Sequence, residues 1–276
     1  MPCTCGADRI PPCKYRRCMA EIDVTRANAI ATVTINRPER KNAVTGDMWA
    51  QLAETFRAIA ADSDVRCVII TGAGGEFCSG ADLSARSSTA RPMHQLAAMR
   101  HVNDAALSLH RMPQPTIAKV RGVAVGAGCN MALGCDLVVA SENARFSEIF
   151  AKRGLSLDFG GSWLLPRRIG LHRAKELALF GDIISAADAR EMGLVNRVLP
   201  DSDIDAFVDG WAQRLASGPP IALALTKRML NNAMNVTMEE ALDDEGAAQT
   251  VNFGTKDTLE AMEAFMQKRE PKFKGH

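Results

Sequence analysis

The first structured part of the chain shows alternating apolar and polar positions. In residues 29–36, alanine, valine and isoleucine alternate for the most part with threonine, which is the two-residue period of a strand. The pattern stops at Arg37-Pro38, and a helical period begins near Asp47. Its apolar face consists of Met48, Leu52, Phe56 and Ile59. We therefore predict a strand followed by an amphipathic helix.

Short apolar runs farther along the chain predict buried strands. These runs are residues 67–72, 116–122 and 137–140. Helical patterns separate them: residues 94–112 are closed by Pro113, and a second apolar helix opens at Gly126-Ala127-Gly128. Short apolar strands that alternate with helices predict an α/β fold, in which helices cover a buried sheet.

Beyond about residue 204 the strand patterns disappear. Phe207, Trp211 and Leu215 are one helical turn apart, and Pro219-Pro220 marks the start of a further helix. Residues 238–252 and 256–268 also have helical patterns. This all-helical quarter is too short for a large core of its own, so we expect it to pack on the main domain, on another subunit, or on both.

Composition narrows the possible partners. The 276 residues carry a net charge of +1 and contain no long run of like charge, which argues against nucleic acid as the main partner. No run reaches the roughly 18 apolar residues that a membrane helix needs. We therefore expect neither a nucleic-acid partner nor a membrane partner.

The eight cysteines are divided between two settings. Cys67 lies in an apolar run and is most simply a small buried hydrophobic residue. Four others crowd the first 18 residues: Cys3, Cys5, Cys13 and Cys18. A zinc site there stays open as an alternative, but the spacing favours a flexible, dispensable tail. The tail lacks the apolar segment of a secretory signal, so we expect a cytoplasmic protein with free thiols.

Two glycine-bearing loops stand out as candidate sites. Residues 71–83 directly follow a strand, and residues 121–130 join a strand to a helix. Tight turns alone would explain the glycines. Neither loop matches a phosphate-binding GxxxxGK[ST] motif or a clean GxGxxG motif, and no serine lies in GxSxG. The loops therefore point away from nucleotide binding and from a serine hydrolase.

Five ordered motifs carry a specific resemblance. They are Asn36-Arg-Pro-Glu-Arg-Lys-Asn-Ala43, Gly80-Ala-Asp-Leu83, Gly122 to Asp136, Phe180 to Val198, and Phe265 to Phe273. In order and spacing they resemble the enoyl-CoA hydratase/isomerase family, also called the crotonase family. The resemblance runs from about residue 20 to the end. It implies a disordered tail at 1–18, a crotonase-like ββα spiral core at 19–203 and a C-terminal helical trimerisation region at 204–276.

The resemblance implies that the two loops form an oxyanion hole. The donors would be the backbone N–H groups of Ala81 and Ala127, which would stabilise the negative charge that develops on a thioester carbonyl oxygen. The family usually has glycine where Ala127 stands, but alanine also supplies an N–H. Close packing of helix on strand is the alternative reason for the glycines around Ala127. Coenzyme A would be part of the acyl-CoA substrate, with no separate cofactor and no metal.

The same resemblance implies a coenzyme A site and an assembly. The coenzyme A moiety would lie along the turn from Lys41 to Ala43 and along Ala81-Asp82-Leu83. Phe265 and Lys268 would contact the nucleotide end from a neighbouring subunit in a trimer or a hexamer. Without the resemblance, Lys268 would be a solvated lysine and Phe265 a core residue.

The reaction is less firmly implied than the family. The two glutamates of the family's hydratases fall here on Asn130 and Phe150, and neither side chain is a general acid or base at neutral pH. Glu148 lies two residues from the second place and would share its face on a strand. Family members that shift double bonds often have an aspartate where Asp158 stands. Burial near Phe150 and Phe159 would raise the pKa of Asp158, although capping a helix or stabilising a turn is its alternative role.

We therefore predict an isomerase of acyl-CoA thioesters with Asp158 as base, including the ring-opening or epoxide-isomerising kind, in fatty acid or lipid metabolism. The alternatives are an enoyl-CoA hydratase that uses a displaced carboxylate such as Glu148, and a non-catalytic acyl-CoA-binding relative. Asn130, Phe150 and Glu148 would then lie in the substrate pocket. Acyl chain length and pathway are not predicted.

Overall fold

A computed structural model describes residues 21–83 and 94–276, so the expected tail at 1–18 lies outside the described residues. A main sheet of six strands forms the centre of the fold, in the order β1-β2-β3-β4-β6-β9. Its strands are β1 Ile22–Ala27, β2 Ile30–Ile35, β3 Cys67–Gly72, β4 Thr116–Val120, β6 Leu137–Ser141 and β9 Arg197–Leu199. β1 is antiparallel to β2, and the other pairs are parallel. The α/β class is confirmed.

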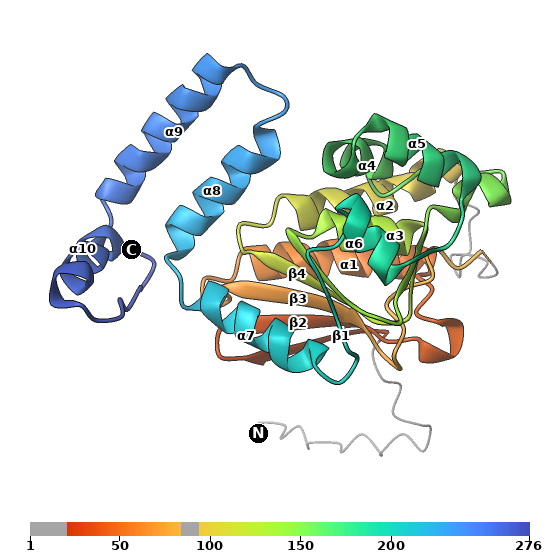
Figure 1. Ribbon diagram of the computed structural model, residues 1–276, viewed down its shortest axis with the longest axis horizontal. Coiled ribbons are helices and arrows are strands. Elements are labelled where there is room, and N and C mark those ends of the chain that lie inside the picture. The colour runs from red at the N-terminus through yellow and green to blue at the C-terminus, as the bar shows by residue number, and fades with distance from the viewer. Residues whose placement is uncertain (1–20, 84–93) are drawn as a thin grey trace, which may run out of the picture.

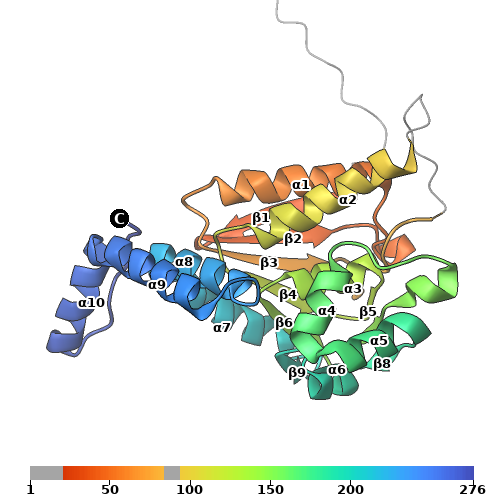
Figure 2. The same ribbon diagram turned by 90° about the horizontal axis from the view of Figure 1, so that it is seen from above.

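The central strands β3, β4 and β6 of the main sheet are buried on both faces, because their apolar side chains point to each face in turn. Val68 and Ile70 of β3 belong to the core under α1 (Gly46–Ala60) and α2 (Gln95–His110), which cover one face (Figure 2). Cys67 and Ile69 point to the opposite face. Cys67 is fully buried, as predicted for a small hydrophobic residue.

α7 (Ile204–Ala216) covers that second face. Ile204, Val208 and Ala212 are buried in one cluster with Cys67 and Ile69. The apolar stripe of Phe207, Trp211 and Leu215 packs partly against the same cluster. These side chains therefore pack on the main domain, which is one of the arrangements expected for the all-helical quarter.

A second, three-stranded sheet was not predicted. It consists of β5 Val123–Val125, β7 Arg145–Ser147 and β8 Ile184–Ser185, in the order β5-β7-β8. Strands of two or three residues are too short to show a period. β5 follows β4 after two residues and leads directly into α3 (Ala127–Gly134), which turns the chain out of the main sheet at the second glycine-bearing loop.

The remaining helices form two groups. Beside the second sheet lie α4 Gly161–Ile169, α5 Leu171–Phe180 and α6 Ala186–Met192. The other group extends away from the body as an arm of α8 Pro220–Asn232, α9 Met238–Phe253 and α10 Lys256–Gln267 (Figure 1). In the described part of the chain, no helix combines the length and the apolar character that crossing a bilayer requires.

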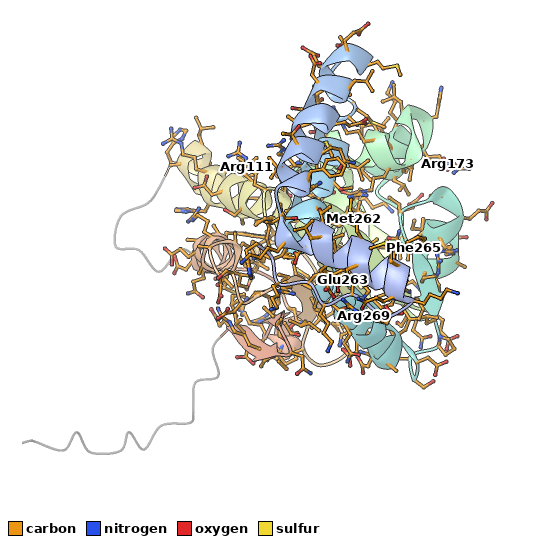
Figure 3. The ribbon with its side chains drawn as sticks, turned by 90° about the vertical axis from the view of Figure 1, so that its left-hand side faces the viewer. Arg111, Arg173, Met262, Glu263, Phe265 and Arg269 are labelled. Atoms are coloured by element: carbon orange, nitrogen blue, oxygen red, sulfur yellow. The ribbon has the colours of Figure 1, made fainter. Side chains whose placement is uncertain are left out.

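The arm leaves many large apolar side chains exposed. Leu230, Met234 and Met238 lie near the turn between α8 and α9, and Met262 and Phe265 lie on α10 (Figure 3). α8 has no buried residue, and α9 has one, Ala248. The arm therefore has little core of its own, as predicted from its length.

Candidate functional site

The turn at residues 37–44 is fixed to the loop after β3 by the buried side chain of Asn42. Its Nδ2 donates to the carbonyl oxygens of Ala73 (2.9 Å) and Glu76 (2.6 Å), and its Oδ1 accepts from the N–H of Arg37 (2.9 Å). Lys41 and Asn42 both have left-handed φ values, of 49° and 56°. The Asn42 hydrogen bonds hold this unusual backbone in place and present Lys41 and Ala43 to the cavity described below.

Two further side chains, Arg37 and Glu76, close this part of the site. Arg37 Nη1 donates to the carbonyl oxygen of Ala43 (2.6 Å) and pairs with Asp82 Oδ2 (3.0 Å). Glu76 accepts from the N–H of Val123 (2.7 Å) and pairs with Lys41 (3.1 Å). Sequence reasoning missed the roles of Arg37, Asn42 and Glu76, because nothing in their local pattern shows what distant loop they contact.

The two glycine-bearing loops lie side by side because they share backbone hydrogen bonds. The N–H of Cys78 donates to Val123 O (2.9 Å), and the N–H of Val125 donates to Cys78 O (3.0 Å). A Cβ on Gly80 would lie 2.8 Å from Val125 O, and Gly80 has a φ of +94°. Glycine at 80 is therefore required both by the backbone conformation and by the close approach of the loops.

Among residues 21–83 and 94–276, no carbonyl or side chain accepts a hydrogen bond from the N–H of either expected oxyanion donor, Ala81 or Ala127. Ala127 is the first residue of α3, where the N–H groups have no partner inside the helix and the helix dipole is positive. Gly126, with φ 57° and ψ −127°, is the turn that opens this helix.

Asp158 lies in the turn before α4. Its carbonyl oxygen accepts from the N–H of Gly161 (2.9 Å), and the N-cap of α4 is Gly160, without a side-chain cap. The Asp158 carboxylate therefore caps no helix. Its Oδ1 is buried without a hydrogen-bond partner in the described part of the chain, and burial raises the pKa of Asp158 to about 6. A base with this pKa is mostly ionised, and still able to accept a proton, near neutral pH.

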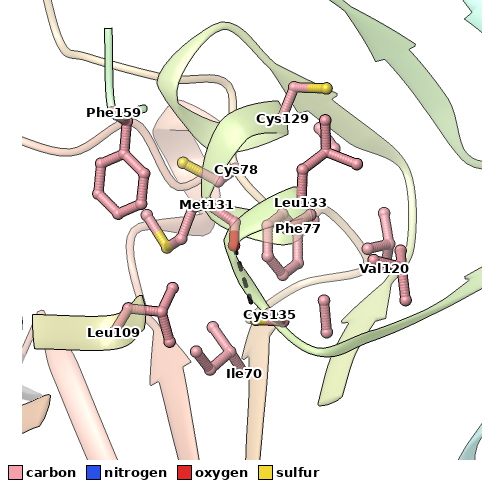
Figure 4. Close-up of a cluster of buried hydrophobic side chains, with 14 of the residues drawn as sticks. Ile70, Phe77, Cys78, Leu109, Val120, Cys129, Met131, Leu133, Cys135 and Phe159 are labelled. Atoms are coloured by element: carbon pink, nitrogen blue, oxygen red, sulfur yellow. Dashed lines mark hydrogen bonds between the residues drawn. The ribbon is translucent and has the colours of Figure 1, made fainter. Parts of the chain in front are cut away.

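Phe159 follows Asp158 with a left-handed φ of 47°. Its ring is buried and lies 5.4 Å from the ring of Trp49, so it points into the core with Leu109 and Met131 (Figure 4). The core therefore holds Phe159 in a conformation that a bulky residue rarely adopts. Of the two phenylalanines expected around Asp158, only Phe150 reaches the same cavity.

A cavity of about 520 Å³ brings most of the predicted site residues together. Its wall includes Lys41, Ala43, Ala81, Asp82, Leu83, Ala127, Phe150 and Asp158. A larger cavity of about 720 Å³ lies between α2, α4 and α8, but it lacks Asp158 and both N–H donors. We therefore place the chemistry in the smaller cavity.

Asn130 and Glu148, expected in the substrate pocket, lie behind the cavity wall rather than on it. Asn130 is fully buried and Glu148 is 1% exposed. Burial raises the pKa of Glu148 to about 8, the neighbouring Cys129 thiol and Asn130 amide lower it in part, and the negative charge of Asp158 raises it. Glu148 is thus mostly uncharged at neutral pH.

Phe265 and Lys268 lie far from this cavity within one chain. Both belong to the end of α10, at the tip of the arm, whereas α3 lies in the body (Figures 1 and 2). Phe265 is 84% exposed, and Lys268 ends the helix with a φ of 53°. Phe265 is therefore not a core residue of its own chain.

The cavity combines two N–H donors with a carboxylate of raised pKa. A carbonyl oxygen held by the N–H groups of Ala81 and Ala127 would carry negative charge more easily, which makes the adjacent carbon atoms more acidic. Asp158 would then be placed to remove a proton. In the described part of the chain, no group of three or more His, Cys, Asp or Glu residues is arranged to hold a metal ion.

The sequence matches the enoyl-CoA hydratase/isomerase family model over residues 25–276. One curated relative is 1,2-epoxyphenylacetyl-CoA isomerase of Escherichia coli K12, which is 39% identical over 89% of this chain and 95% of its own length. Another is 2,3-dehydroadipyl-CoA hydratase of the same organism, with 35% identity over 93% of this chain and 100% of its own. The relatives thus include both an isomerase and hydratases.

The fold is also similar to solved structures. The crystal structure of an enoyl-CoA hydratase from Bacillus anthracis superposes with a TM-score of 0.88, at 34% identity, over 93% of this chain and all of that one. An enoyl-CoA hydratase subunit from Geobacillus kaustophilus HTA426 gives a TM-score of 0.86 at 32% identity, over 93% of this chain and 99% of its own.

Proposed function

The chain belongs to the enoyl-CoA hydratase/isomerase family, and we propose that within it the protein isomerises an acyl-CoA thioester with Asp158 as base. The observation that carries the proposal is the position of Asp158, which lines the same cavity as Ala81 and Ala127. Asp82 also lines this cavity, but its carboxylate is paired with Arg37. Asp158 is therefore the better base.

The proposed reaction needs one base and no added water. The thioester carbonyl oxygen accepts hydrogen bonds from Ala81 and Ala127 while Asp158 removes a proton from a carbon conjugated to that carbonyl. The electron pair of the broken C–H bond moves into the enolate, and protonated Asp158 returns the proton to another carbon. Atoms and charge balance, and the double bond has moved. In a strained ring or epoxide substrate, the same enolate chemistry would open the ring.

The substrate class follows from the cavity wall and the family. We propose that the coenzyme A thioester lies along Lys41 to Ala43 and along Ala81 to Leu83, which form one side of the cavity. Coenzyme A enters as part of the substrate. The relative named 1,2-epoxyphenylacetyl-CoA isomerase supports the isomerase proposal.

A screen of acyl-CoA esters tests the proposed function. The purified protein is incubated with 2-enoyl-, 3-enoyl- and epoxide-bearing CoA esters, absorbance is followed, and products are identified by mass. We expect products of unchanged mass. A product heavier by one water would identify a hydratase, and binding without turnover of any ester would identify a non-catalytic relative.

We also propose that the protein self-associates through the arm formed by α8, α9 and α10. Its exposed apolar side chains, among them Phe253, Leu259, Met262 and Met266, lack a partner in the described part of one chain. We expect a trimer or a hexamer, because burying such faces against other copies removes apolar area from water. Sedimentation of the purified protein checks this, and a stable, active monomer would contradict it.

Lys268→Ala is expected to raise KM for coenzyme A esters about tenfold, with a smaller effect on kcat. Loss of one hydrogen bond from a charged group costs about 1.5–3 kcal/mol, and about 1.4 kcal/mol corresponds to a factor of ten. Lys274→Ala, at an exposed lysine near the same end, is the matched control. If both variants keep the normal KM, Lys268 does not contact the nucleotide.

A further inference from the structure

We propose that Asn130 and Glu148 form a buried clamp that positions Asp158 relative to the oxyanion hole, through hydrogen bonds of the Asn130 amide. The proposal rests on the proposed function, because it assigns the clamp a role through Asp158. Neither clamp residue lies on the cavity wall. Both are therefore positioning residues rather than residues that touch the substrate.

The Asn130 side chain uses both of its N–H groups. Nδ2 donates to the carbonyl oxygen of Asp158 (3.0 Å) and to Glu148 Oε2 (3.3 Å). The amide has two such hydrogens, so the two acceptors use its whole donor capacity. The Asn130 side chain thus connects the turn that contains Asp158 with Glu148, the residue that follows β7.

Asn130 also belongs to the helix that carries an oxyanion donor. Its own N–H donates to Gly126 O (3.0 Å), which closes the first turn of α3 beside Ala127. The amide therefore links the N-terminal turn of α3 directly to the Asp158 main chain. A misplacement of about 1 Å between reacting groups can cost about 10²-fold in rate, so this link has a direct consequence for turnover.

The start of α4 is shaped to receive the amide. A Cβ on Gly161 would lie 2.4 Å from Asn130 Nδ2 and 2.7 Å from Oδ1, so only glycine leaves the required space. Gly161 also donates its N–H to the Asp158 carbonyl oxygen (2.9 Å). That oxygen thus receives two hydrogen bonds, one from α4 and one from α3, and the turn is held from both sides.

Glu148 completes the clamp as a buried acceptor. Its Oε1, Asn130 Oδ1 and Asp158 Oδ1 are all buried without a hydrogen-bond partner in the part of the chain described. Burying three acceptors without a donor lowers the free energy of unfolding unless protons or water molecules provide the missing hydrogen bonds. A proton on Glu148 is consistent with its raised pKa, and it spares Asp158 a second negative charge nearby.

The clamp predicts the effects on kcat and KM of substitutions at Asn130 and at Glu148. Asn130→Ala removes both hydrogen bonds, and Asn130→Asp keeps the shape but replaces the donor by an acceptor. Each is expected to lower kcat about 10–100-fold while KM changes less than threefold, because the base is misplaced and the ester contacts remain. Glu148→Gln is the conservative variant of the second clamp residue, and it is expected to lower kcat less than Asn130→Ala does, because the amide retains an oxygen acceptor for Asn130.

Gln114→Ala is the matched control for loss of a buried amide. Gln114 Nε2 donates to the carbonyl oxygens of Ile59 (3.0 Å), Asp62 (3.3 Å) and Val65 (3.2 Å), away from the cavity. We expect this variant to lower Tm, as Asn130→Ala does, but to leave kcat unchanged. An equal loss of kcat in both variants would make the Asn130 effect one of general stability and overturn the clamp.

A double-mutant cycle separates the clamp from the proposed function. If Asn130 acts only through Asp158, then Asn130→Ala added to Asp158→Asn is expected to lower kcat no further than Asp158→Asn alone. A further loss of tenfold or more would overturn the clamp while leaving Asp158 as base. Normal turnover in Asp158→Asn alone would instead contradict the proposed function. If Asn130→Ala raises KM and leaves kcat unchanged, Asn130 contacts the substrate and the clamp is wrong.

Discussion

Asp158→Asn is expected to lower kcat for isomerisation by about 10²–10⁴, the usual contribution of a positioned general base. Asparagine keeps the size of the side chain, but it cannot accept a proton and hold it. The N–H groups of Ala81 and Ala127 are unchanged, so affinity for the coenzyme A ester should remain close to that of the wild type. Steady-state kinetics and calorimetric binding of an ester measure the two effects separately.

The same substitution should not weaken the fold at neutral pH. Burial raises the pKa of Asp158 above its usual value of 3.8, which means that the folded state disfavours the charged carboxylate. A neutral amide removes this penalty at pH values above the pKa. A Tm at pH 7 equal to or higher than that of the wild type is expected, whereas a large decrease would mean that lost activity reports unfolding.

The pH dependence of kcat/KM provides an independent test of Asp158. The base must be ionised, so activity should rise with pH through about 6, the pKa of Asp158, and reach a plateau above it. Below this pH the protonated carboxyl cannot remove a proton from the substrate. A profile that is flat between pH 4.5 and 7.5 would assign the base to another group.

Ala127→Pro is expected to lower kcat by about 10²–10³, the typical cost of removing one oxyanion-hole donor. Proline lacks the N–H, but its fixed φ suits the first position of a helix, and Ala127 is that position in α3. The substitution therefore removes the donor at the place where proline disturbs a helix least. Burial of Ala127 makes a folding control necessary.

Gly46→Pro provides that control. Gly46 is the first residue of α1, a Cβ there would meet no atom within 4 Å, and the preceding Thr45 has the extended backbone that proline favours. This variant should fold and turn over normally. Normal kcat in a folded Ala127→Pro variant as well would remove Ala127 from the mechanism.

Sequence reasoning succeeded where a local pattern determines the structure. The apolar period of α1, the short run of β3 and the break at Pro113 each predict an element within a few residues, because burial on one or both faces fixes them. The strands of the second sheet, such as β5 at Val123–Val125, are too short to show any period. They form only because segments far apart in the sequence pair with one another, β5 with β7 and β7 with β8.

The site residues can likewise be divided into those that the sequence indicates and those whose position depends on the packing of distant segments. The resemblance selected Lys41, Ala81, Ala127 and Asp158 as site residues, and the structure places these four in the wall of one cavity. It did not predict that Asn130 and Glu148 lie behind the wall, because side-chain direction depends on how α3 and α4 pack. Likewise, the stripe on α7 left open whether it packs on the main domain or on another subunit, and the structure shows it against the sheet face.

Incubation in ¹⁸O-labelled water tests the central claim most directly. Proton transfer by Asp158 within a bound thioester adds no oxygen from solvent, whereas hydration of a double bond adds one atom. With the ester that the protein turns over, mass spectrometry should show a product without ¹⁸O, and its formation should fall sharply in Asp158→Asn. Rapid ¹⁸O incorporation that survives in Asp158→Asn but disappears in Glu148→Gln would contradict the account and identify a hydratase that uses Glu148.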